Sequence, residues 1–175
     1  LAPFPVRTGW WRSLGLLANV FATESFMDEL AHEAGADPLQ FRLDHLADDK
    51  FGQRMKAVLI DAAEKAGYGS ELPEGQAWGV ACCPDVDTLV AMVVAVSVDD
   101  AGVITVHKAV QSIDPGIVIN PDGAKAQAEG NIVWGISSSL IEEMTVSNGT
   151  VRPRNFDGYP LVTIDKIPDL DIHFV

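Results

Sequence analysis

One stretch, residues 114–135, constrains the fold of this chain more than any other; it reads DPGIVINPDGAKAQAEGNIVWG. It follows a β-like run and turns through Pro115 and Gly116, two residue types that favour turns. Asn120 is suited to cap a helix, and Pro121 suits the first helical position, where a missing N–H loses no hydrogen bond. The sequence therefore predicts a strand, a tight turn and a helix in direct succession.

The predicted helix is rich in residues with little or no side chain. Glycine inside a helix is unfavourable by about 1 kcal/mol relative to alanine, so glycines here need a reason. One stripe at helical spacing reads Gly123, Gln127, Gly130 and Trp134. Two interpretations are open: tight packing of the helix on a sheet, or close approach of a bound cofactor, with Gln127 as its polar contact.

The remaining patterns divide the chain into a helical part and a β-rich part. Residues 16–34, 37–46 and 51–66 carry helical periodicity or helix-start signals. Strands are expected at 78–83, 88–98, 103–113, 159–164 and 169–175, with an Asn-Gly hairpin within 143–153. Residues 88–98 are nearly all apolar, which predicts a strand buried on both faces. Residues 1–8 are expected to form an extended arm.

We therefore predict one α+β domain over residues 1–175. Residues 1–68 should be mainly helical, and residues 76–175 should be β-rich with a helix at 120–141. In this architecture, N-terminal helices precede a mixed or antiparallel sheet, and the sheet packs against a long helix rich in glycine and alanine.

Composition limits the classes of partner. The chain has 25 acidic and 12 basic residues, a net charge of −13. Such a surface repels nucleic acid and anionic membranes, so neither is an expected partner. No apolar run approaches the ~20 residues that span a bilayer. The adjacent Cys82 and Cys83 are poorly placed to pair with each other and are expected as reduced side chains on a strand.

Two charged residues stand in unusual surroundings. Arg12 follows two tryptophans in the run GWWRSLG, where it could stack on a ring or bind an anion. Glu24 lies on an otherwise apolar face of the first predicted helix, as either a catalytic base or a structural ion-pair partner. The four histidines are scattered without the spacing of metal ligands.

Three segments keep the order and spacing of a known family: the WWRS turn, the INPD…AQAEG block and NFDGYPL. In these motifs the chain resembles the molybdopterin-binding large subunit of the xanthine oxidase and aldehyde oxidoreductase family. Within that family it is most similar to the isoquinoline 1-oxidoreductase beta-subunit branch. The resemblance covers nearly the whole chain.

The resemblance implies a molybdenum hydroxylase, which oxidises an aldehyde or an N-heterocycle with oxygen derived from water. The implied cofactor is molybdenum on molybdopterin, in the cytosine dinucleotide form. The implied partners are a small iron–sulfur subunit with [2Fe–2S] clusters, which receives the electrons, and a small-molecule substrate. Such an enzyme is expected in the bacterial cytoplasm or periplasm.

The resemblance also assigns individual residues. Arg12 matches the arginine of a turn beside the molybdenum centre, and Gln127 matches a glutamine that contacts the pterin; the metal takes no protein side chain. The catalytic glutamate of the family is expected beyond Val175. The chain is thus expected to be a C-terminal piece that is inactive without the remaining part of the large subunit. The alternative from composition alone is an acidic α+β interaction module with no redox role.

Overall fold

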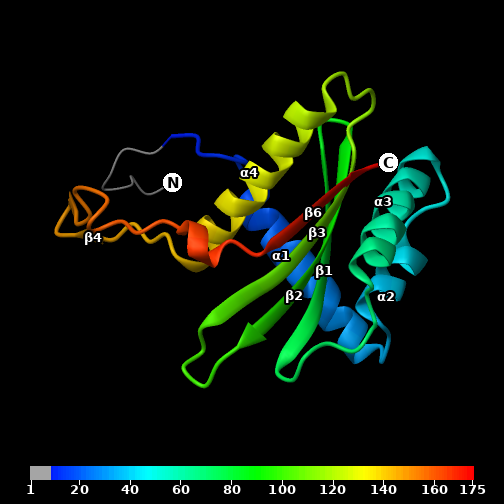
Figure 1. The fold of residues 1–175 in the computed structure, drawn as a ribbon, viewed down its shortest axis with the longest axis horizontal. Helices are drawn as coiled ribbons and strands as arrows, with labels where there is room; N and C mark the ends of the chain where they lie inside the picture. The colour runs from blue at the N-terminus through cyan, green and yellow to red at the C-terminus, as the bar shows by residue number, and fades with distance from the viewer. Residues whose placement is uncertain (1–8) are drawn as a thin grey trace.

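A four-stranded sheet lies at the centre of the computed structural model, which describes residues 9–175 (Figure 1). The extended arm expected for residues 1–8 lies outside the described part. The strands, in spatial order, are β1 (Gln76–Asp85), β2 (Thr88–Val98), β3 (Ile104–Asp114) and β6 (Asp169–Phe174). The first three pair antiparallel and β6 pairs parallel to β3. The sheet is therefore mixed, and the predicted α+β class is confirmed.

One face of the sheet is closed by α3 (Lys50–Ala66), with α2 (Pro38–His45) beside it. Asp37 and Asp49 cap these helices through their carboxylates, and Gly67, in the left-handed region, ends α3. The predicted starts and ends are thereby confirmed within a residue or two. The core on this face consists of buried aliphatic residues from α3 and the first three strands, including Met55, Val58, Leu59, Val80, Leu89, Val93 and Val110.

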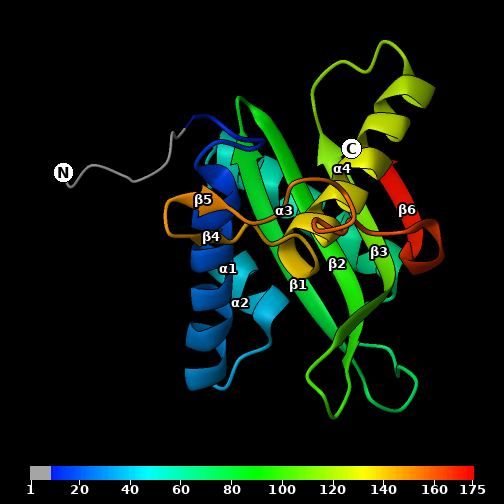
Figure 2. The ribbon, with the colours of Figure 1, turned by 90° about the vertical axis from the view of Figure 1, so that its left-hand side faces the viewer.

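The opposite face is covered by α4 (Pro121–Leu140), which lies over β3 and β6 (Figures 1 and 2). Its start is as predicted, because Asn120 accepts a hydrogen bond from the Gly123 N–H at 3.0 Å. Ala128 and Ile132 are the buried apolar residues of the helix, and they pack with Ala109 and Ile172 of the sheet.

Strand β2 differs from the prediction that both of its faces are buried. Its fully buried residues alternate, and Leu89, Ala91 and Val93 belong to the core beneath α3. Met92 and Val94 face the other side and are only partly buried. The cause is incomplete cover, since Met92 and Val94 contact the cluster beneath α4 on one side and face an open groove on the other.

Helix α1 (Leu16–Glu33) runs beside the free edge of β1 (Figure 2). The helix predicted at 16–34 is confirmed. Only Ala31 of this helix is buried, and the Phe21 and Phe26 rings are largely exposed. The apolar stripe that predicted the helix is therefore mostly unburied among residues 9–175. No helix in the described residues is long and apolar enough to cross a membrane.

The C-terminal part holds two confirmed predictions and one wrong one, and the strand expected at 169–175 is confirmed as β6. The Asn-Gly hairpin forms as β4 (Val146–Ser147) and β5 (Thr150–Val151), with Asn148 and Gly149 at positive φ. The strand predicted at 159–164 is wrong, since the segment has no regular structure before a short 3-10 helix, η1 (Ile164–Lys166). The Val162 N–H donates to Ser137 Oγ of α4 at 3.1 Å, and β6 already occupies the edge of β3.

Candidate functional site

The glycine stripe of α4 lies away from the buried face of that helix. Gly123, Gln127 and Trp134 are exposed, whereas Ala128 and Ile132 face the sheet. Apart from the neighbouring residues and backbone of α4 itself, a Cβ built on Gly130 would meet no described atom within 4 Å, and the same holds for Gly135. Tight packing within the described residues therefore does not explain either glycine. The stripe is a surface on which the backbone of α4 can be approached closely.

Arg12 lies at the C-terminal end of this stripe. Its guanidinium carbon is 4.2 Å from the centroid of the Trp134 ring, a cation–π distance. The sequence pointed to the neighbouring Trp10 and Trp11 as possible rings, but the ring that Arg12 covers belongs to α4. Arg12 is carried to this position by a tight turn before α1, in which Ser13 and Leu14 have positive φ.

Both site residues predicted from the sequence are thus associated with one helix face. Trp134 follows Gln127 by seven residues, about 10 Å along the helix axis. The face combines an exposed amide, an exposed guanidinium and, at Gly130 between them, one backbone position without a side chain. A guanidinium can pair bidentately with a phosphate or carboxylate, and an amide can both donate and accept. The surface can therefore hold a polar, anionic ligand along α4.

The sequence left two roles open for Glu24, a catalytic base or a structural ion-pair partner, and the structure shows the ion pair. Its Oε2 is 3.0 Å from Nε of Arg42, whose side chain is 2% exposed, and it also accepts the Cys82 N–H at 2.8 Å. Arg42 further donates to Asp28 at 2.6 Å and to the carbonyls of Pro38 and Glu24. The network fastens α1 to α2 and to the edge of β1. No sequence pattern pointed to Arg42, because the sequence of a short helix does not distinguish a buried arginine from an exposed one.

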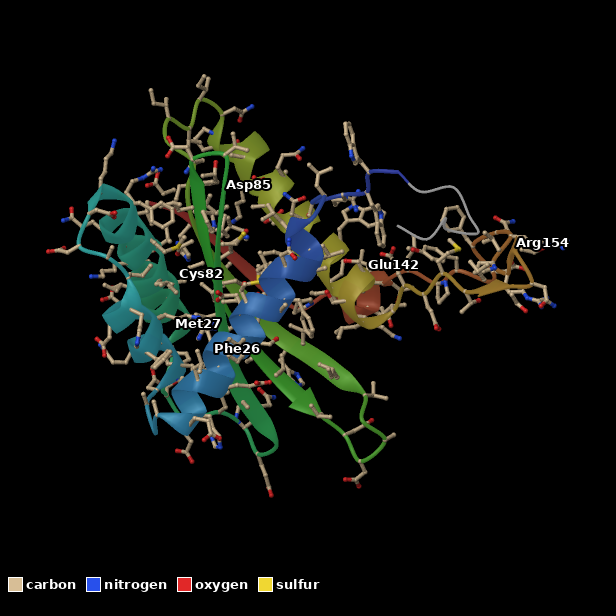
Figure 3. All side chains as sticks on the ribbon, turned by 180° about the vertical axis from the view of Figure 1, so that it is seen from behind. Phe26, Met27, Cys82, Asp85, Glu142 and Arg154 are labelled. Carbon is tan, nitrogen blue, oxygen red and sulfur yellow. The ribbon has the colours of Figure 1, made fainter. Side chains whose placement is uncertain are left out.

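The two cysteines lie on β1, as predicted, and both are free thiols. Cys82, labelled beside α1 in Figure 3, has its pKa raised to about 12, mainly by burial. Burial also raises the pKa of Cys83. Both thiols stay protonated near neutral pH, which makes them weak nucleophiles. Among residues 9–175, no three or more His, Cys, Asp or Glu side chains gather where they could hold a metal ion.

A third arginine, Arg54 on α3, joins two turns at one end of the sheet. It donates to Asp114 at 2.6 Å, where β3 ends before α4, and to the carboxylate and carbonyl of Asp87 in the β1–β2 turn. The bond from Arg54 holds the pKa of Asp114 below its ordinary value. Asp114 also accepts the Gly116 N–H at 3.2 Å. This cluster, absent from the sequence predictions, fixes the turn that leads into α4.

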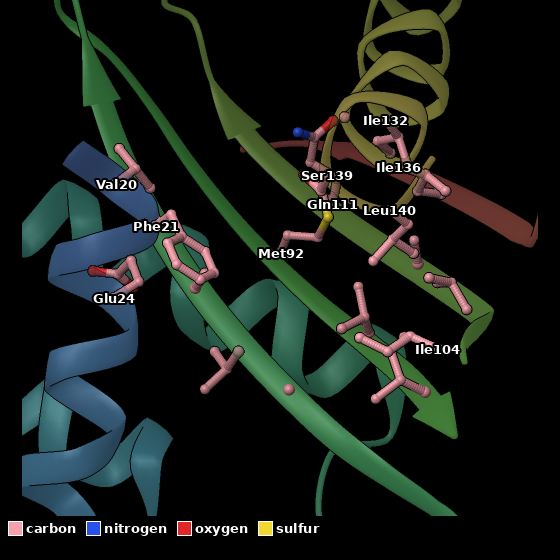
Figure 4. A pocket seen from close by; sticks show the side chains of 18 of the residues that line it. Val20, Phe21, Glu24, Met92, Ile104, Gln111, Ile132, Ile136, Ser139 and Leu140 are labelled. Carbon is pink, nitrogen blue, oxygen red and sulfur yellow. The ribbon is translucent and has the colours of Figure 1, made fainter. Parts of the chain in front are cut away.

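An apolar groove of about 510 Å³ lies between α1 and α4, over the uncovered part of the sheet. Figure 4 shows Phe21 on the α1 side, Ile136 and Leu140 on the α4 side, and Met92 and Gln111 between them. This groove was not predicted, because the apolar residues that line it come from elements whose relative placement the sequence does not give.

Comparison with known proteins identifies the family. The model of the molybdopterin cofactor-binding domain matches residues 27–168, which include Gln127. The chain is 37% identical over its whole length to a membrane-bound aldehyde dehydrogenase (pyrroloquinoline-quinone) of Gluconacetobacter polyoxogenes, of which it covers 25%. It is 30% identical, over 95% of its length, to the beta subunit of isoquinoline 1-oxidoreductase of Brevundimonas diminuta and to a nicotinate dehydrogenase subunit of Pseudomonas putida.

The chain covers 21% of the isoquinoline relative and 15% of the nicotinate relative, so it spans a quarter or less of the curated relatives named here. The family model nevertheless matches most of the chain, from the second half of α1 through α4 to the residue before β6. By this match, the chain belongs to the molybdopterin cofactor-binding domain family.

Proposed function

We propose that this chain, acting as one domain, forms part of the cofactor-binding surface of a molybdenum hydroxylase. The whole enzyme would oxidise an aldehyde or an N-heterocycle with oxygen derived from water. The observation that carries the proposal is the open face of α4 in a chain of the molybdopterin-binding family. On this face, a Cβ at Gly130 would meet nothing within 4 Å beyond the adjacent part of α4. The names of the relatives support the substrate classes: an aldehyde, isoquinoline and nicotinate.

The residues on this face fit a molybdopterin. Gln127 is exposed and would exchange hydrogen bonds with the polar edge of the pterin. Gly130 would let the ring system approach the helix backbone. Arg12 would pair with negative charge near the metal, and its stacking on Trp134 would hold the guanidinium in place. The bound molybdenum centre supplies the redox and oxygen-transfer chemistry.

The wider enzyme follows from the family resemblance. The cofactor would carry the cytosine dinucleotide, and electrons would pass to a small subunit with [2Fe–2S] clusters. The proton-transferring glutamate would lie in another part of the large subunit, outside residues 1–175. On this proposal, residues 1–175 bind and orient the cofactor but turn over no substrate alone.

Elemental analysis of the intact, matured subunit tests the proposal. Gln127→Ala should lower the molybdenum and pterin content several-fold, because it removes the amide that faces the cofactor. Lys125→Ala, on the same helix, should leave both unchanged, since its only described partner is Glu129 at 4.0 Å. A matured subunit without molybdenum would overturn the proposal.

The name of the aldehyde dehydrogenase relative favours a second candidate, a pyrroloquinoline-quinone enzyme. The same preparation decides between the two, because the quinone can be extracted and identified by its absorption and mass. Stoichiometric quinone in the absence of molybdenum would establish the second candidate. A subunit with neither cofactor would instead point to the acidic interaction module.

A further inference from the structure

The groove between α1 and α4 contains a polar group that the described residues leave unsatisfied. Gln111, on β3, is 8% exposed and lines the groove, and its Oε1 is buried without a hydrogen-bond partner among residues 9–175. A buried carbonyl oxygen without a donor costs about 1–3 kcal/mol. Native proteins rarely retain such a group without a protein or water partner. The donor must therefore come from outside these residues, as either a water in the groove or a further polypeptide segment.

The apolar surface continues beyond the groove itself. Its floor includes Met92 and Val94, and its rim includes Phe21, which is 75% exposed. Figure 4 shows the Phe21 ring projecting from α1 toward the strands. Leu17 and Phe26 of α1 are also exposed apolar residues. A small molecule that filled about 510 Å³ would leave this part of α1 uncovered, whereas a polypeptide segment would cover the groove and its rim together.

The length of the relatives indicates where such a segment comes from. The chain covers 25% of the aldehyde dehydrogenase relative. Most of that polypeptide therefore lies outside the matched region, and it provides ample chain to cover one open sheet face. A sheet face that is open to water is normally polar, whereas this face presents Met92 and Val94, which are residues typical of a covered face.

We propose that a segment of the same subunit, outside residues 1–175, lies in the groove between α1 and α4. The segment presents apolar side chains to Met92, Val94 and Phe21, and it places one N–H donor against Oε1 of Gln111. The groove is then part of the interior of the subunit, and it is separate from the cofactor-facing stripe. The inference does not depend on which cofactor the enzyme binds.

Photo-cross-linking in the intact subunit tests this inference. p-Benzoylphenylalanine replaces Phe21 at the rim of the groove, and a matched protein carries it in place of Phe51, an exposed phenylalanine on α3. After irradiation, mass spectrometry should find position 21 joined to the same polypeptide outside residues 1–175. A link to a second copy, to another subunit or to residues 1–8 would overturn the inference, as would the absence of any protein link. The inference rests on the proposed function only in requiring a subunit longer than residues 1–175. The readout needs no molybdenum, so its failure can be distinguished from a failure of the cofactor proposal.

A stability measurement provides a second test whose sign separates the alternatives. If a segment donates a hydrogen bond to Gln111, Gln111→Leu leaves that buried donor without an acceptor. The urea midpoint of the intact subunit then falls. If the groove stands open, the same change replaces an unsatisfied amide by an apolar group, and the midpoint stays equal or rises. Gln40→Leu, at an exposed position of α2, gives the reference midpoint.

Discussion

At the scale of single residues, the buried guanidinium of Arg42 is the charge that most needs compensation by neighbouring groups. It is held by the carboxylates of Glu24 and Asp28 and by two backbone carbonyls. Asp28 is about half exposed, whereas Glu24 is 16% exposed and therefore provides the better-shielded charge. Removing one partner from a buried pair is costly because the other charge remains without compensation.

We expect Glu24→Gln to lower the free energy of unfolding by about 2–3 kcal/mol, somewhat less than the loss typical of a fully buried pair, because Asp28 still binds Arg42. The amide oxygen can still accept the Cys82 N–H, so the change tests the charge. Urea denaturation measures the effect, and Glu29→Gln, on the exposed side of α1, serves as the control. Equal midpoints for the two variants would show that the pair contributes nothing.

Gly130→Ala separates the two interpretations of the glycine stripe. The new methyl group meets nothing within 4 Å beyond the adjacent part of α4 among the described residues, and alanine favours a helix over glycine by about 1 kcal/mol. The cofactor-free subunit should therefore become slightly more stable. If a pterin lies against this face, the molybdenum content of the matured Gly130→Ala subunit should also fall. A more stable subunit with full molybdenum content would place the cofactor elsewhere.

At the scale of elements, Arg54 couples a helix to two turns that are distant in sequence. Asp87, in the β1–β2 turn, has a positive φ, as does Val86 before it. Asp114 ends β3, and the chain then turns toward α4. The direction in which α4 starts therefore depends on a contact made by α3, on the other face of the sheet.

This cluster predicts a specific dependence of stability on pH. The native pKa of Asp114 is below its ordinary value of 3.8, so its charge stabilises the fold above that value. The contribution is lost as the pH falls through the native pKa. The difference in unfolding free energy between the wild type and Asp114→Asn should therefore be constant above about pH 5 and shrink toward zero below about pH 4. In an Arg54→Ala background, the difference should be small at every pH.

The elements that local patterns specify could be predicted from the sequence. Helix α3 has a cap, an apolar stripe and a terminal glycine, and the hairpin has Asn148 and Gly149 in its turn. The segment 159–164 has apolar residues like a strand, but its Val162 N–H bonds to Ser137. The open face of β2 and the unsatisfied Gln111 are equally invisible to local patterns, because both depend on what other elements fail to cover.

At the scale of the whole molecule, two surfaces stay uncovered among residues 9–175: the exposed stripe of α4 around Gly130 and the apolar groove between α1 and α4. We expect residues 1–175, produced alone, to contain no molybdenum and to oxidise no aldehyde. On the proposed function, the intact subunit should contain molybdenum and should oxidise an aldehyde. Elemental analysis and a dye-reduction assay on the two proteins measure this. Turnover by residues 1–175 alone would contradict the placement of the catalytic glutamate outside them.

The parallel pairing of β6 with β3 has a consequence for the order of folding. Strands β1, β2 and β3 join through short turns, so their pairing closes small loops and can occur early. Lys108 pairs with Asp169, and this contact closes a loop of about 60 residues that contains α4. Ile172 of β6 also supplies part of the surface on which Ala128 and Ile132 pack. The meander should therefore form first, and β6 and α4 should dock on it together as the last step.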